Sequence, residues 1–270
     1  MKKLYADISE HNTVSSLKGV DGVMIRAGWG YGKKDKKLKQ HVQMAEKAGI
    51  PYGFYWYGYA LTVEQAKKEA KICLETIKGY NPTLPIAYDL EDGDGWKKAN
   101  GGIPSKKVNT AIVKTFCEAL EEAGYYAMYY VNYDWWANKI YHTQLEQYAL
   151  WIAWWGRSDK PNLGANEYMH QYTSDGKVAG ISGRVDLNYC YVDFVSAIKE
   201  NGLNGYKSKT PKIKVGDEVK VTKPINYDNG KKFTLYFKTY DVLEVVGSRA
   251  VIGIGDTVTS AIDVKYLVKV

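Results

Sequence analysis

The sequence predicts an α/β fold: an irregular TIM-like β/α barrel of about five regular β/α units plus closing strands, then a small all-β barrel. Up to residue 131, short strand patterns alternate with amphipathic helix patterns, which is typical of parallel βαβ units. One of these strands carries two carboxylates on a single face. Beyond residue 205 only short alternating strands and turns remain, which predicts a separate all-β domain.

The first half of the chain alternates strands with helices. Gly49 stands at the C-cap position of a helix expected over 35–48. Thr62 to Gln65 has the form of a capping box, and Ser105 is in place to cap a third helix. The strands between these helices are expected at 4–8, 22–27, 52–57, 85–92 and 126–131.

After residue 131 the alternation becomes irregular. The segments between the later strands hold roughly a dozen residues rich in Gly, Ser and Asn, which is short for helical crossovers between parallel strands. The barrel is therefore expected to close irregularly, and an antiparallel last strand is one way to close it. We expect a helix over 134–148, strands over 150–154, 167–172 and 184–188, and a last helix over 191–199.

Composition divides the chain into a barrel over 1–205, a linker over 206–213 and a small domain over 214–270. The linker is rich in lysine and contains Pro211. Residues 206–270 hold 12 Lys and Arg against 7 Asp and Glu, while residues 1–205 hold 25 against 23. A small basic domain indicates a tether to an anionic surface, although lysines also serve solubility.

Composition also excludes several classes of protein. With 45% apolar and 25% charged residues, the 270-residue chain resembles a soluble globular protein. No run of about 18 apolar residues occurs, so no membrane insertion is predicted. Three scattered Cys and four scattered His lack metal-ligand spacing, so neither a metal nor a cofactor is expected. The lysine run over 33–39 reads as a solvated helix face, and no nucleic-acid motif accompanies it.

The strand over 85–92 carries the chemistry. Its period of two places Asp89 and Glu91 on one face, opposite an apolar face. Active sites of β/α barrels lie at the C-terminal ends of the strands, although an Asp-x-Glu alone also suits the start of a polar loop. Asp7 and Asp186 fall near the ends of the first and last strands, which are neighbours in a closed barrel. Four converging carboxylates resist ionising together, and such an arrangement serves a glycosidase better than it serves stability.

Aromatic residues with a polar group are unusually common. The chain has 24 Tyr and 8 Trp against 5 Phe, a balance that suits a wet cleft where sugar rings stack, although Tyr is also a good strand former. Any one of the candidates near strand ends could equally be core packing, and for Trp154 we favour the cleft. The sugar-binding candidates are Tyr57, Tyr129, Trp151, Trp154 and Gln171.

Five ordered motifs resemble those of glycoside hydrolase family 25, the Chalaropsis-type lysozymes that include many phage endolysins. The resemblance covers roughly residues 1–200 and departs from the family pattern at Glu10-His11-Asn12, to which we assign no role. The motifs are Ala6-Asp-Ile-Ser9, Pro85-Ile-Ala-Tyr-Asp-Leu-Glu91, Leu150-Trp-Ile-Ala153, Gln171-Tyr172 and Val185-Asp-Leu-Asn188.

The resemblance implies cleavage of the β-1,4 bond between N-acetylmuramic acid and N-acetylglucosamine in peptidoglycan. When the roles known for the family's motifs are transferred to the matching positions, the resemblance implies that Glu91 is the general acid and Asp89 the second catalytic carboxylate. It also implies that Asp7 and Asp186 support and orient them. Spacing alone leaves open a direct nucleophile, an activated water or attack by the substrate's 2-acetamido oxygen. The resemblance favours Asp89 assisting that acetamido group.

The tail resembles bacterial SH3-like wall-binding modules at Lys214 to Val219 and at Tyr266-Leu267. Peptidoglycan is then both the substrate and the ligand of the tail, and the protein is an endolysin or autolysin. The start of the chain reaches Asp7 before an apolar signal core forms, which predicts synthesis in the cytoplasm without a signal peptide. Action on the wall would follow holin-type export or lysis. The alternatives are a chitinase-like glycosidase and a non-catalytic glycan-binding protein, and no oligomeric state is predicted.

Overall fold

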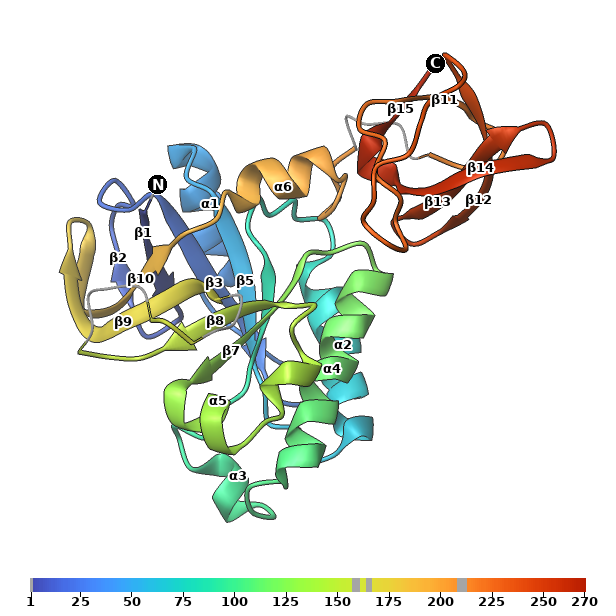
Figure 1. Cartoon of the computed structure of the whole chain (residues 1–270). Helices are drawn as coiled ribbons and strands as arrows, with labels where there is room; N and C mark the ends of the chain where they lie inside the picture. The colour runs from blue at the N-terminus through green and yellow to red at the C-terminus, as the bar shows by residue number, and fades with distance from the viewer. Residues whose placement is uncertain (1, 157–160, 164–166, 208–212) are drawn as a thin grey trace. The chain divides into compact units, whose positions relative to one another are not determined.

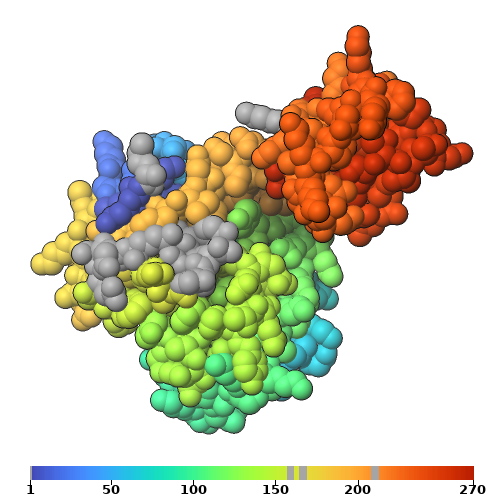
Figure 2. Space-filling model, viewed as in Figure 1, coloured from blue at the N-terminus to red at the C-terminus, as the bar shows by residue number. Residues whose placement is uncertain are grey.

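The computed structural model describes residues 2–156, 161–163, 167–207 and 213–270. The chain divides into two compact units, Met1–Lys207 and Ser208–Val270 (Figure 1). Figure 2 shows one face of the surface of each unit, coloured along the chain. Each unit has buried hydrophobic clusters of its own.

The first unit is built on an eight-stranded, barrel-like sheet. Its strand order is β1-β10-β9-β8-β7-β6-β5-β3, and pairing of β1 with β3 closes the circle. Neighbouring strands are parallel except at β10, which runs antiparallel to both β1 and β9. The predicted barrel and the antiparallel closing strand are thus confirmed. The strands are β1 (Lys3–Ile8), β3 (Gly22–Trp29), β5 (Tyr52–Tyr57), β6 (Ile86–Asp89), β7 (Ala127–Asn132), β8 (Ala149–Ala153), β9 (Glu167–Val178) and β10 (Ile181–Cys190). Short strands β2 (Thr13–Val14) and β4 (Lys33–Lys34) pair at its margins.

Most helices cover the outside of this sheet, while Phe194 and Ile198 of the last one join the inner core cluster. Helix ends follow the sequence signals. Thr62 and Gln65 form the predicted capping box, and the Ser105 side chain accepts the amide of Val108. Gly49 ends its helix in the left-handed conformation with φ of 65°. The helices are α1 (Leu38–Ala48), α2 (Val63–Ile77), α3 (Trp96–Ala99), α4 (Lys106–Glu122), α5 (Tyr133–Asn138) and α6 (Phe194–Glu200).

The helix expected over 134–148 is much shorter than predicted. Only Tyr133–Asn138 is α-helical, followed by a 3-10 turn over His142–Gln144. The amide of Tyr141 donates to the Thr110 hydroxyl on α4 at 2.8 Å. This amide is therefore not available for the backbone hydrogen bonds of a continuing helix. The last two strands are longer than predicted, because their polar residues continue the pairing of a hairpin whose turn includes Gly180 with φ of 90°.

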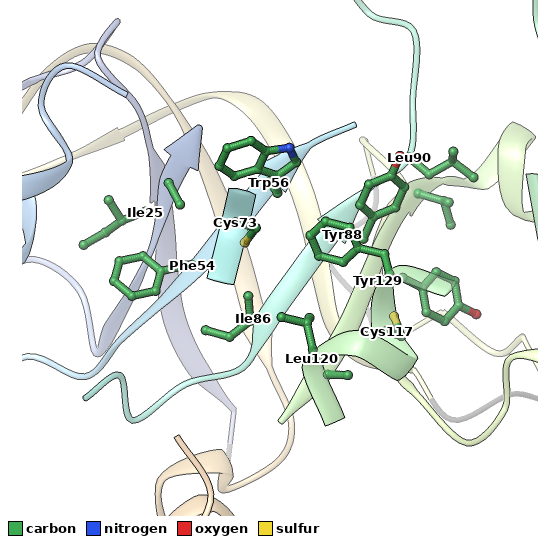
Figure 3. Close-up of a cluster of buried hydrophobic side chains, with 14 of the residues drawn as sticks. Ile25, Phe54, Trp56, Cys73, Ile86, Tyr88, Leu90, Cys117, Leu120 and Tyr129 are labelled. Carbon is green, nitrogen blue, oxygen red and sulfur yellow. The ribbon is translucent and has the colours of Figure 1, made fainter. Parts of the chain in front are cut away.

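Apolar packing fills both faces of the sheet. Ile86, Tyr88 and Leu90 of the β6 segment point toward the helices and are fully buried there, as the predicted alternation requires (Figure 3). Ala87 faces the barrel interior among the side chains of the other core cluster. The next two residues on that inner face are Asp89 and Glu91, so the alternation directs both carboxylates into the barrel mouth.

The second unit is a five-stranded antiparallel sheet with its own small core around Val219, Tyr240 and Ile252. Residues 232–236, which lie among the short alternating segments of this part of the sequence, form only an isolated bridge from Lys232 to Ile225. The amides of Tyr236 and Phe237 donate to the Tyr240 hydroxyl, so they do not pair with a strand. The sheet order is β14 (Thr257–Asp263), β13 (Arg249–Ile254), β12 (Tyr240–Val246), β11 (Glu218–Val221) and β15 (Leu267–Lys269), with a 3-10 turn at Val264–Tyr266.

Two smaller observations concern the pairing of the cysteines and the lengths of the helices. Cys73, Cys117 and Cys190 are all free and buried, which agrees with packing roles for the first two. Within the described ranges, no helix is long and apolar enough to span a bilayer.

Asn204 ties the end of the first unit to the barrel. It is fully buried and adopts a left-handed backbone with φ of 56°. Its side-chain oxygen accepts the amide of Tyr126 at 2.8 Å, and its amide donates to the carbonyls of Pro82 and Leu84 at 2.9 Å each. One side chain therefore joins the segments that lead into β6 and β7.

We expect Asn204→Ala to lower the free energy of unfolding by at least about 3 kcal/mol, because three buried backbone groups lose their partners and alanine disfavours positive φ. Urea unfolding followed by circular dichroism measures the change. Asn201→Ala, at an exposed position nearby, is the matched control and should change little. Equal stability of the two variants would contradict this account.

Candidate active site

The four predicted carboxylates line a single pocket of about 300 Å³. Asp7 lies near the end of β1, Asp89 is the last residue of β6, Glu91 follows two residues later, and Asp186 lies on β10. The pocket thus opens at the C-terminal end of the parallel strands, where barrels place their active sites. In the described part of the chain, no group of three or more His, Cys, Asp or Glu side chains is arranged to hold a metal.

Strand register brings these acids together. Asp7 and Asp186 are directly opposite each other in the antiparallel pair of β1 and β10. On the parallel side, Asp89 stands between Tyr57 of β5 and Tyr130 of β7. Residues opposite each other in paired strands have Cβ atoms about 5 Å apart, so the backbone alone sets this clustering.

Neutral amides hold Asp7. Its Oδ2 accepts the side-chain amides of Asn188 at 2.8 Å and Gln171 at 3.1 Å. The oxygen of Gln171 in turn accepts the Tyr130 hydroxyl at 3.1 Å and the indole N–H of Trp155 at 2.9 Å. These bonds fix the orientation of both amides and connect Asp7 to the rings of the pocket wall.

Burial and mutual repulsion raise the pKa of these acids. Burial is the main cause that raises the pKa of Asp7 well above its usual value, and the charge of Asp186 adds to it, while Asn188 and Gln171 oppose. The pKa of Asp186 is also raised by burial. Since like charges at this distance resist ionising together, this pair holds a proton to higher pH than isolated aspartates do.

Glu91 has the character of a general acid. Burial raises its pKa to about 7; Lys97 opposes this shift, whereas Asp186 and Asp94 add to it. Burial, and then Glu91, also raise the pKa of Asp89. A carboxyl group with a pKa near 7 retains its proton at neutral pH often enough to donate it.

Gly93 leaves room for the Glu91 side chain. A Cβ at position 93 would lie 2.9 Å from Glu91 Oε2 and 3.5 Å from the Tyr57 hydroxyl. The turn after β6 therefore needs a residue without a side chain if the carboxyl group of Glu91 is to keep this position.

A second pocket of about 440 Å³ adjoins the first and shares Arg26, Tyr57 and Glu91 with it. Tyr59, in its wall, stacks on Trp96 with ring centroids 4.4 Å apart and donates to Asp94 at 2.5 Å. Aromatic faces next to carboxylates suit pyranose rings, which are apolar on one face and carry hydroxyls at the edge. Glu91 therefore stands between two spaces that suit sugars.

The residues predicted to bind sugar fall into two groups, according to which face of the barrel strands they occupy. Tyr57, Trp151 and Gln171 line the first pocket. Tyr129 instead packs toward the helices and is 2% exposed, while its neighbour Tyr130 lines the pocket. Adjacent strand residues face opposite ways, so the prediction chose the wrong neighbour of the two.

Trp154 also lies outside both pockets. Its ring stacks on Tyr133 with centroids 3.9 Å apart, whereas Trp155 lines the first pocket. Tyr129 and Trp154 were each predicted at the correct strand end but on the wrong face of the strand. The period of two shows that neighbouring residues face opposite ways, and it leaves open which of the two faces points into the barrel.

Sequence reasoning missed two cations. The sequence analysis assigns no arginine or lysine a role in the site, yet Arg26 lines both pockets and donates from Nε to Asp35 at 2.9 Å. Arg26 alternates with apolar residues on the second strand, and that lone inward charge was the available signal. Lys97 lies under the site on a helix too short for a periodic pattern. Glu10 and His11, given no role above, line the second pocket.

A model of the Glycosyl hydrolases family 25 matches residues 5–181, which include three of the four acids. The chain belongs to this family. Its curated relative, an autolytic lysozyme of Clostridium acetobutylicum, is 31% identical over 170 residues. That alignment covers 63% of this chain and 48% of the relative, so the chain spans about half the length of the protein it matches.

Solved structures of proteins named as endolysins, autolysins or lytic enzymes resemble this family 25 chain. The CTP1L endolysin is 26% identical with a TM-score of 0.62, over 73% of this chain and 69% of its own. The autolysin LytC of Streptococcus pneumoniae is 30% identical with a TM-score of 0.63, over 70% and 47%. The spore cortex lytic enzyme SleM of Clostridium perfringens, at 16% identity and a TM-score of 0.63, covers 100% and 86% and shows the fold alone.

The raised pKa of Glu91 predicts how the stability of the fold depends on pH. The pKa of Glu91 rises from 4.5 to about 7 on folding, so the folded state binds its proton more tightly and stability falls as pH rises through this range. We expect Glu91→Gln to raise the free energy of unfolding by roughly 1 to 3 kcal/mol at pH 8 and to change it little at pH 4. Denaturant unfolding at both pH values measures this.

The control for this experiment is Glu122→Gln, at an exposed position of α4. It should show no comparable dependence on pH. A Glu91→Gln effect of equal size at both pH values would show that burial does not raise the pKa of this carboxyl group.

Proposed function

We propose that this chain is an N-acetylmuramidase, a lysozyme that cleaves the β-1,4 bond between N-acetylmuramic acid and N-acetylglucosamine in peptidoglycan. The observation that carries the proposal is the position of Glu91, between a pocket lined by four carboxylates and a pocket lined by aromatic rings. Family membership supports it, as do relatives named lysozyme, endolysin and autolysin. One such structure, LytC, is in complex with a synthetic peptidoglycan ligand.

In this proposal Glu91 protonates the glycosidic oxygen between a sugar in the first pocket and one in the second. Its pKa of about 7 keeps the proton available at neutral pH. The same carboxylate then takes a proton from the water that completes hydrolysis. Activity consequently declines as pH rises above about 7, because the general acid is then ionised.

Asp89 orients the 2-acetamido group of the sugar in the first pocket. Its Oδ1 is buried, and among the described residues it has no hydrogen-bond partner. A buried acceptor without a donor costs free energy, and the acetamido N–H is a donor of the right kind. With that N–H held, the acetamido oxygen attacks the anomeric carbon as the bond to the leaving sugar breaks.

Asp7 and Asp186 complete the pocket. Asp7 holds Gln171 and Asn188, and Asp186 raises the pKa of Glu91 by repulsion. The ring of Tyr57 is offered to the sugars, with Trp155 in the place first given to Trp154. Trp151 lines the same pocket but is 1% exposed, so it supports the pocket wall.

The second unit serves, in this proposal, as an SH3-like module that holds the protein on the wall. Its support is a separate five-stranded antiparallel sheet and an excess of basic residues over 206–270. Bacterial walls carry anionic polymers, which attract such a surface. The whole protein would then act as an endolysin or autolysin that stays near its substrate.

The bond specificity is testable from the products. We expect the full chain to release wall fragments whose new reducing ends are N-acetylmuramic acid, identified by mass spectrometry after borohydride reduction. Glu91→Gln should lower kcat by roughly 10² to 10⁴, the usual contribution of a general acid. Glu122→Gln is the control.

Other product patterns would replace the proposal. Reducing ends of N-acetylglucosamine would assign a different glycosidase specificity. Wall binding without any released sugar ends, equal in the unmodified chain and Glu91→Gln, would indicate a glycan-binding protein without turnover.

The wall-binding role of the second unit is tested by truncation after Lys207. Each unit has its own core, so the first should fold alone. We expect at least about a tenfold loss of activity on intact walls, because the effective concentration at the wall is lost, with activity on soluble glycan fragments unchanged. An equal loss on both substrates would show that the second unit supports the barrel instead.

A further inference from the structure

Lys97 is a fully buried cation beneath the catalytic acid. Its ammonium group donates to the backbone carbonyl of Glu91 at 2.7 Å and to the backbone carbonyl of Gly58. It therefore joins the segment after β6, which carries Glu91, to the segment after β5.

The short helix α3 places Lys97 there. The side chain of Asp92 accepts the amide of Lys97 at 2.6 Å and that of Lys98 at 3.3 Å, which starts the helix one turn after the catalytic strand. Trp96 stacks on Tyr59 beside the second pocket. Trp96 of this helix thus lies beside the second pocket, and the next residue, Lys97, contacts the backbone of Glu91.

Burial lowers the pKa of the Lys97 ammonium group, and nearby carboxylates oppose this shift. They are Glu69 of α2, Asp89 of β6 and, after that strand, Asp92 and Glu91. Glu69 is itself fully buried and accepts the Tyr59 amide at 2.8 Å and the Tyr88 hydroxyl at 3.0 Å.

Stability alone is a poor reason for a lysine at this position. Taking an ammonium group out of water is expensive, and a well-packed apolar side chain of similar volume commonly stabilises as well or better. The charge faces Asp89 and Glu91 from below, and it lowers the pKa of both. Its position therefore points to a role in the chemistry of that pair.

We propose that Lys97 is a positioning residue, which holds the main chain of Glu91 in place by hydrogen bonding and sets a buried positive charge beside the Asp89 and Glu91 pair. The inference rests on the proposed hydrolase function and deepens it. Glu91 and Asp7 also act on Asp89 and oppose its ionisation, whereas Lys97 and Arg26 favour it. Glu91 faces Asp186 and Asp94 as well as Asp89.

The test is the pH dependence of kcat/KM for the full chain on soluble peptidoglycan fragments. The acid limb reports ionisation of Asp89 and the alkaline limb reports ionisation of Glu91. In Lys97→Met both limbs should move to higher pH by about half a unit or more, because both carboxyl groups lose a neighbouring cation. Loss of the backbone tether should lower kcat roughly tenfold with little change in KM, since positioning acts on the reacting group.

Lys98→Met is the matched control, since Lys98 is the exposed neighbour on the same helix. It should leave both limbs in place. Glu69→Gln combined with Lys97→Met removes the buried charge of Glu69 together with that of Lys97, so it protects against unfolding caused by a buried carboxylate that has lost a neighbouring cation. It should show the same displaced limbs. Limbs that stay at their original pH in the folded variants overturn the proposal.

Two further measurements keep the inference separate from the proposed function. If the unmodified chain releases no sugar ends, the proposed function fails, and NMR titration of labelled glutamate carboxyl carbons still shows whether Lys97→Met raises the pKa of Glu91. If no variant folds, nitrogen NMR of the lysine side chains of the unmodified chain shows whether the amine of Lys97 is charged. A charged Lys97 over pH 5 to 8 supports the proposal, and a neutral one overturns it.

Discussion

The pairing of β10 with β1 is the contact on which the site depends. It closes the barrel, and its register puts Asp186 opposite Asp7. The same strand contributes Asn188, whose amide binds Asp7. Because β10 runs antiparallel to its neighbours, a compact hairpin replaces the helical crossover that a parallel strand would need. The chain thereby completes a β/α barrel with fewer helices than strands and leaves the mouth beside β10 open.

The site balances repulsion between acids against a small number of favourable contacts. Buried carboxyl groups destabilise the fold when they ionise, and the pKa of each of the four is raised for that reason. Amides of Gln171 and Asn188 compensate on one side, and Lys97 with Arg26 on the other. Neutral donors thus contact Asp7, while Lys97 and Arg26 act on Asp89.

Much of the fold and part of the site were predictable. Caps at Thr62 and Ser105 and the period of two in β6 are local signals, and the structure contains the features they predict. The errors arise where distant contacts decide. The hydroxyl of Thr110 on a neighbouring helix ends the helix expected over 134–148. Whether Tyr129 or Tyr130 faces inward depends on barrel closure, which period alone leaves open. Lys97 gave no signal, since its role comes from three-dimensional proximity.

The closing strand also affects how the protein is made. The hydrogen bond between Asn188 and Asp7 joins residues 181 positions apart, so the pocket forms only after nearly the whole first unit has left the ribosome. Contacts of such long range slow folding, and until they form, the β1 edge is open to other strands. A growing chain would therefore carry its acids without an assembled site. The complete pocket therefore has to wait until β10 is in place.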